Sequence, residues 1–222
     1  MGGSSRQSLA ALRSALDSSL KGASSGDCSH LSSDLFSALG ALESSAGLRR
    51  ALTDPARDVA AKSNLVSDLF KSVLKGPALA LLTQAAGLRW SSPADFADAI
   101  EQLAVEAEAA AANSENKLDS LLDELFGFSK SLVENPDLRS ALTNSGDTLA
   151  RKVELMKSIF GAKFGSHTIS LITQIVSGRS GRSIEKTLSA HIHAVTARRN
   201  RVNAFISTAI PLTSVQQEKL AA

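Results

Sequence analysis

Residues 92–143, SPADFADAIEQLAVEAEAAAANSENKLDSLLDELFGFSKSLVENPDLRSALT, decide how this chain folds. The Ser92 side chain can accept a hydrogen bond from a free N–H group at a helix start, and Pro93 suits the first helical position. Asp95 adds a negative charge where the helix dipole is positive. Neither Gly nor Pro follows as far as Ala112, so the sequence predicts one long helix there.

A second helix is predicted after the polar segment 113–116. Its apolar residues recur at three- and four-residue spacing, which places them on one helical face. They are Leu118, Leu121, Leu122, Leu125, Phe128, Leu132 and Val133. Pro136 interrupts this pattern, and residues 138–142 form a last short turn. Because no segment alternates apolar and polar residues as a strand does, the predicted fold class is all-α.

The two halves of the chain align without a gap when the sequence is shifted by ninety residues. LRRALT at 48–53 falls on LRSALT at 138–143, and LTQ at 82–84 falls on ITQ at 172–174. The aligned identities include Lys62 with Lys152, Phe70 with Phe160 and Arg89 with Arg179. A repeat of this length exceeds one solenoid unit of about 20–50 residues. It therefore predicts two tandem helical bundles.

The predicted bundles span residues 6–112 and 92–210, and residues 211–222 are predicted to be the start of a truncated C-terminal region. Because both bundles include residues 92–112, the central helix is predicted to close the first bundle and open the second. Aromatic residues make up only 4% of the chain, with no Tyr, which also argues against a core of strands. Within the first bundle, a helix is predicted to start near Pro55, after Thr53 and Asp54.

The sequence offers little for catalysis or metal binding. It contains no phosphate-binding loop, no zinc-ligand spacing and no nucleophile triad, so we expect no enzyme, no cofactor and no metal. His191 and His193 would point about 200° apart on a helix, and a surface position is expected for both. The single cysteine, Cys28, cannot form an internal disulfide. No run of eighteen apolar residues predicts a membrane span.

A basic region lies at residues 179–201. It contains Arg179, Arg182, Lys186, Arg198, Arg199 and Arg201, opposed only by Glu185. Such a cluster could bind phosphates or an acidic protein, so an adaptor for nucleic acid or an anionic surface is the alternative function. A solvated helix face is the favoured interpretation, since the net charge of +2 is too small to indicate nucleic acid.

Residues 100–142 resemble the opening of the delta subunit of F-type ATP synthases, called the oligomycin-sensitivity conferring protein in mitochondria. The resemblance lies in an alanine-rich first helix, in LDSLLDELF at 118–126 and in ENPDLRSAL at 134–142. It continues in KVELMKSIFG at 152–161, and in RRNRV at 198–202 leading to AIPLT at 209–213. The upstream copy resembles the extended actinobacterial form, in which some members carry a fused b-type stalk.

This resemblance implies a non-catalytic stator subunit that links the catalytic alpha/beta head to the b stalk, on the cytoplasmic face of the bacterial plasma membrane. The expected partners are the alpha and beta subunits, with the b stalk held mainly by a C-terminal part of the family that is expected to be missing from this sequence. No nucleic acid is expected. A groove between amphipathic helices would bind the amphipathic N-terminal helix of an alpha subunit. The candidate partner-binding residues are Phe96, Ile100, Leu103, Ile184, Leu188, Ile192, Arg198, Arg199 and Arg201.

Overall fold

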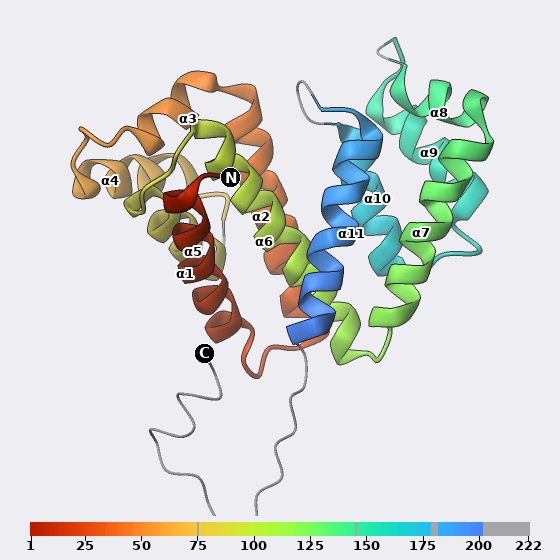
Figure 1. Ribbon diagram of the computed structural model, residues 1–222, viewed down its shortest axis with the longest axis horizontal. Coiled ribbons are helices and arrows are strands. Elements are labelled where there is room, and N and C mark those ends of the chain that lie inside the picture. The colour runs from red at the N-terminus through yellow and green to blue at the C-terminus, as the bar shows by residue number, and fades with distance from the viewer. Residues whose placement is uncertain (75, 145, 179–181, 202–222) are drawn as a thin grey trace, which may run out of the picture.

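The computed structural model describes residues 1–74, 76–144, 146–178 and 182–201. These ranges contain helices and no strand, which confirms the predicted all-α fold (Figure 1). The side chain of Arg201 and residues 211–222 are not among what is described. The helices are α1 (Gly3–Leu20), α2 (Ser25–Ser44), α3 (Ala46–Thr53), α4 (Val59–Phe70), α5 (Gly76–Gly87), α6 (Pro93–Ser114), α7 (Leu118–Glu134), α8 (Pro136–Thr143), α9 (Leu149–Phe160), α10 (Ser166–Ser177) and α11 (Ile184–Arg201).

Local side-chain chemistry sets several of the helix starts. The Ser92 hydroxyl accepts a hydrogen bond from the Asp95 backbone N–H, which confirms the predicted start of α6. The prediction of a helix start at Pro55 is wrong. The Asp54 side chain instead accepts a hydrogen bond from the Ala56 backbone N–H, which makes a turn, and α4 begins only at Val59.

Helix α6 occupies the centre of the molecule. It packs on α1, α2 and α3 from the first half of the chain and on α7, α10 and α11 from the second half (Figure 1). Fourteen of its residues are buried, many of them alanines whose small side chains let neighbouring helices approach closely. At its C-terminal end, Asn116 adopts the left-handed conformation, with φ of 57°, and the chain turns there into α7.

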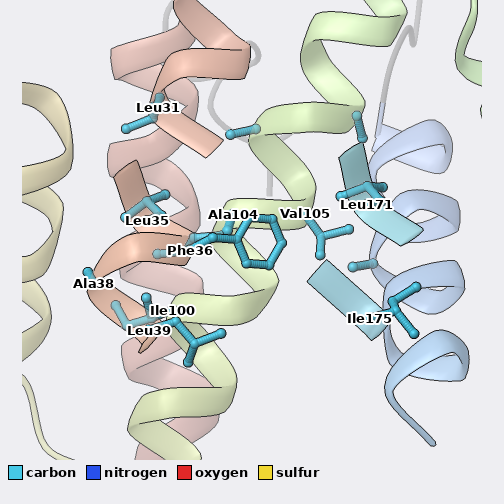
Figure 2. Packing of buried hydrophobic residues seen from close by; sticks show 14 of the residues in the cluster. Leu31, Leu35, Phe36, Ala38, Leu39, Ile100, Ala104, Val105, Leu171 and Ile175 are labelled. Atoms are coloured by element: carbon cyan, nitrogen blue, oxygen red, sulfur yellow. The ribbon is translucent and has the colours of Figure 1, made fainter. Parts of the chain in front are cut away.

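The buried apolar side chains form one continuous cluster that includes both halves of the chain. Figure 2 shows part of it, where Leu35 and Phe36 of α2 lie beside Ala104 of α6, and Val105 points toward Leu171 and Ile175 of α10. Burial of this kind contributes about 25 cal/mol for each Å² of apolar surface removed from water. The two halves are therefore joined by a shared core.

Helix bounds in the two halves are spaced by ninety residues. Helices α3, α4 and α5 begin and end ninety residues before α8, α9 and α10, and α1 begins ninety residues before α6. This spacing agrees with the alignment of the sequence on itself. The duplication of one bundle, and the domain limits drawn from it, remain a prediction.

Candidate functional site

The six apolar residues predicted to bind a partner are placed inside the molecule. Phe96, Ile100 and Leu103 of α6 are fully buried, and Ile184 and Leu188 of α11 are nearly so. Ile192 is half-buried against the same core. In this conformation these side chains hold α6 and α11 to their neighbours and leave little apolar surface for another protein.

The three arginines that were predicted to bind a partner have different surroundings. Arg198 forms an ion pair with Asp17 of α1, and Arg199 lies 3.6 Å from Asp119 of α7. Arg201 ends α11, but its side chain is outside the described residues. Arg198 and Arg199 therefore tie the end of α11 to both halves of the chain.

A buried polar cluster joins α6 to α11. Arg182, just before α11, donates hydrogen bonds of 2.6 Å to both Asp98 and Glu101, while His191 Nε2 lies 3.2 Å from the second Glu101 oxygen. His191 is only 1% exposed, so its predicted surface position is wrong, whereas His193 is exposed as predicted. A carboxylate buried this deeply requires such partners. A cleft of about 170 Å³ opens beside the cluster, between α6 and α11.

A second cluster joins α6 to α2 and α10. His167 Nδ1 of α10 lies 2.7 Å from the buried Glu108 carboxylate, which also accepts a hydrogen bond from Ser29 of α2. His167 Nε2 lies 3.5 Å from Glu115. The hydrogen bond to Glu108 raises the pKa of His167, against the opposing effect of burial. Hydrogen bonds from Lys117 and Ser25 lower the pKa of Glu115 to about 2.

A third pair joins α6 to α1. Arg13 donates a 2.8 Å hydrogen bond to Glu106, whose side chain is fully buried.

The sequence contains a pattern that could have indicated that these three glutamates are buried. Glu101, Glu106 and Glu108 stand in a helix that is otherwise apolar on nearly every side, and such a helix is buried all round. Helix α6 is therefore held to α1, α10 and the region of α11 by paired charges, and to α2 by the Ser29 hydrogen bond to Glu108, as well as by apolar packing.

The basic region does not form an open cationic surface in the part that the structure describes. Arg182 and Arg198 contact acidic side chains of α6 and α1, and Glu185 faces Arg139 at 4.0 Å. Residues 179–181 are outside the description, although Gly178 ends α10 with a φ of 77°, as expected for a helix-ending glycine. The alternative function, binding nucleic acid or an anionic surface, is not supported.

The outer surface carries several large apolar side chains in the described ranges. The most exposed are Val59, Leu69 and Val73 at and just beyond α4, Phe126 and Val133 on α7, and Leu149 on α9. None of the helices so described is long and apolar enough to cross a bilayer. Within residues 1–74, 76–144, 146–178 and 182–201, no three His, Cys, Asp or Glu side chains are placed so that they could hold a metal ion.

Comparison with known proteins gives consistent matches. The model of the family described as ATP synthase delta (OSCP) subunit matches residues 96–222. The ATP synthase subunit delta of Streptomyces avermitilis is 38% identical over 220 residues, which cover 99% of this chain and 80% of that protein. The subunit of Streptomyces coelicolor is 37% identical over 100% of this chain and 81% of its own length. The ATP synthase subunit delta of Kineococcus radiotolerans is 36% identical over 99% of this chain and 79% of its own length.

Proposed function

The chain belongs to the ATP synthase delta (OSCP) subunit family, and we propose that it joins the catalytic head of an F-type ATP synthase to the b stalk. As a member of this family it is a structural subunit of the peripheral stalk. Its work would be mechanical, because the head must be held still against the torque of the turning rotor.

The observation that carries the proposal, beyond family membership, is the way in which α6 holds both halves of the chain together. Its buried carboxylates pair with Arg13 of α1, His167 of α10 and Arg182 before α11. Breaking one such pair by removing a partner costs about 3–5 kcal/mol, because a charge is left buried without compensation. Bending at this junction would break several pairs at once, which suits a subunit that transmits load.

The proposed partners and the proposed location follow from the role in the stalk. The alpha and beta subunits are the proposed partners of the helical part, and the b stalk is the proposed partner of the part that follows residue 211. The chain would act without catalysis or nucleotide and would lie at the cytoplasmic face of the bacterial plasma membrane. The exposed apolar residues, rather than the buried Ile100 and Leu188, are better placed to contact the head.

A pull-down from a detergent extract of the bacterial membrane tests the proposal. The tagged chain should recover the alpha and beta subunits, identified by mass spectrometry, and a tagged unrelated helical protein should not. Recovery of nucleic acid in a salt-sensitive manner, without head subunits, would favour the rejected alternative.

A further inference from the structure

One histidine lies between the two halves of the chain at the C-terminal end of α6. His167, the second residue of α10, is 7% exposed, and its two ring nitrogens face two different carboxylates. Nδ1 lies 2.7 Å from Glu108 of α6, and Nε2 lies 3.5 Å from Glu115, the residue that follows α6. Because seven residues make about two helical turns, the two carboxylates lie on the same side of α6.

Helix α2 of the first half completes the same arrangement. Ser29 donates a 3.1 Å hydrogen bond to Glu108, and Ser25, one turn earlier, donates a 2.6 Å hydrogen bond to Glu115. Each carboxylate is therefore shared between a serine of α2 and the histidine of α10. We call Ser25, Ser29, Glu108, Glu115 and His167 the latch, since together they connect α2 to α10 across α6.

Protonation of the imidazole determines whether the latch is balanced in charge. A neutral imidazole carries one N–H, so one nitrogen turns a lone pair toward a carboxylate, whereas the imidazolium donates from both nitrogens. The hydrogen bond to Glu108 raises the pKa of His167, burial opposes this, and the charges of Glu108 and Glu115 add to the rise. Within the described part of the chain, these two carboxylates are the charged groups that act on His167 directly.

Helix α7 supplies a further charge at the start of α10. The positive end of the α10 dipole disfavours a cation at His167. Glu124 of α7 offsets this effect, because its carboxylate accepts hydrogen bonds from the Gly165 backbone N–H and from the Thr168 hydroxyl. A protonated histidine is therefore tolerated at this helix start.

Two cations lie close to the latch, but neither replaces the histidine. Lys117 lies 2.7 Å from Glu115, and Arg198 of α11 pairs with Asp17 of α1. In the described ranges, neither cation forms an ion pair with Glu108, whose polar partners are Ser29 and the histidine. The balance of charge at this buried carboxylate therefore depends on the imidazole.

We propose that the latch is a pH-sensitive connection between the two halves of the chain, closed when His167 is protonated and open when it is neutral. Opening separates α2 and α10 from the last two turns of α6. Because the folded pKa of His167 is raised above the unfolded value, the closed form is fully favoured below the unfolded pKa. It is lost as the pH rises through the folded pKa. One consequence rests on the proposed function: the stalk is stiffer at acidic than at alkaline pH.

Cys28, the single cysteine of the chain, is a native probe of this opening. It precedes Ser29 on α2 and is 3% exposed. Burial raises the pKa of the Cys28 thiol, and the charges of Asp27 and Glu108 add to this effect. The thiol is therefore protected while α2 lies against α6 and reacts when that contact opens.

Labelling of Cys28 with an aromatic disulfide reagent, between about pH 6 and 8.5, spans the range in which a histidine with a raised pKa titrates. The rate is divided by that of a short unstructured cysteine peptide at the same pH, because the thiolate is the reactive form. The normalised rate of the parent should rise several-fold with pH. His167→Gln should label fast at every pH, and the matched control His193→Gln, at an exposed histidine of α11, should follow the parent.

Glu115→Gln separates the latch from a purely structural role of the histidine. The Glu115 side chain is 36% exposed, so the variant should fold, and the loss of one carboxylate should move the midpoint of the normalised rate to lower pH. An unmoved midpoint would contradict bridging by two carboxylates.

Two further results would overturn the proposal. One is a normalised rate of the parent that does not change with pH, or a His167→Gln variant that keeps the parental dependence. The other is a free energy of opening, measured at Cys28, that equals the free energy of global unfolding in urea, because labelling would then report no local opening. Either result leaves the proposed function standing, since recovery of the head subunits tests that function separately.

Discussion

At the scale of single residues, the central helix combines fully buried apolar side chains with buried carboxylates. Glu101, Glu106 and Glu108 are each less than 5% exposed, and each has a basic or histidine partner on another helix. Buried ion pairs of this kind add little net stability compared with apolar packing, but they strongly penalise any arrangement that separates them. Their contribution here is to fix how α6 sits against its neighbours.

Replacement of Ile100 by Asp should reduce the free energy of unfolding by more than about 3 kcal/mol, because a carboxylate would be buried without a partner. Ile100 is fully buried in the shared core. Urea denaturation followed by circular dichroism measures the change, with Phe126→Asp as the exposed control. Equal stability of the two variants would show that Ile100 is not in the core.

His167 predicts a pH dependence. Its pKa is raised in the folded protein above the ordinary histidine value, so protonation stabilises the fold. This contribution is complete below the unfolded pKa, near about 6.5, and is lost as the pH rises through the raised folded pKa. Glu115 does not titrate in the pH range in which His167 does, because its pKa of about 2 keeps it ionised there.

The measurement is the unfolding free energy of the parent and of His167→Gln between about pH 5 and 9. The difference between the two proteins should be greatest at the acidic end and shrink toward the alkaline end. A difference that stays constant, or grows with pH, would exclude a stabilising charge on His167.

At the scale of elements, α6 belongs to both halves of the chain. The sequence could predict its start at Ser92, its length and the all-α class, because capping residues and apolar spacing are local signals. It could not predict that His191 is buried, since the partner Glu101 lies ninety residues away in the chain. The Pro55 prediction was wrong for a local reason, because the Asp54 side chain makes a turn instead of starting a helix.

The candidate site shows the same limit. The spacing of the apolar residues places Phe96 and Ile100 on an apolar helical face. It does not determine whether other helices of the chain cover that face or whether a partner binds to it. The structure covers it with other helices of the same chain. In the sequence, the exposed Phe126 could not be distinguished from the buried apolar residues of the same amphipathic helix.

Replacement of Ala109-Ala110 by Gly-Gly should cost about 2 kcal/mol of helix propensity at most, yet loosen the angle between the two halves. The pair lies in α6, where helices from both halves pack. Small-angle X-ray scattering should show a broader distance distribution than in the parent. The matched control is Gly-Gly in place of Ala60-Ala61, an exposed pair in α4.

The control should lose similar helix propensity without changing the scattering profile. If the α6 variant scatters like the parent, the junction is not what sets the angle. The same conclusion follows if a protease already cuts the parent between Ala109 and Asn116.

At the scale of the whole molecule, the chain has the properties of a connector. One core runs through both halves, and the exposed apolar residues lie at separate places, on and beyond α4 and on α7 and α9. We propose, from the ninety-residue repeat of the sequence, that one bundle was duplicated and fused through a shared helix. Fusion through a helix gives a stiffer junction than a loop, which is what a torque-bearing part requires.

The absence of a phosphate-binding loop from the sequence leads to a prediction about nucleotides. Isothermal titration calorimetry with ATP and Mg²⁺ should show no saturable binding at micromolar concentrations, and the chain should not hydrolyse ATP. The purified catalytic head provides the positive control. Saturable micromolar binding to the chain alone would contradict a purely structural role.

The central claim is that this protein holds the catalytic head to the stalk, and the most direct measurement is the coupling of ATP hydrolysis to proton pumping in inverted membrane vesicles. Vesicles from cells depleted of the protein should still hydrolyse ATP, because catalysis resides in the head, but should pump few protons, and re-expression should restore pumping. Pumping at the parental rate per ATP hydrolysed after depletion would contradict the account.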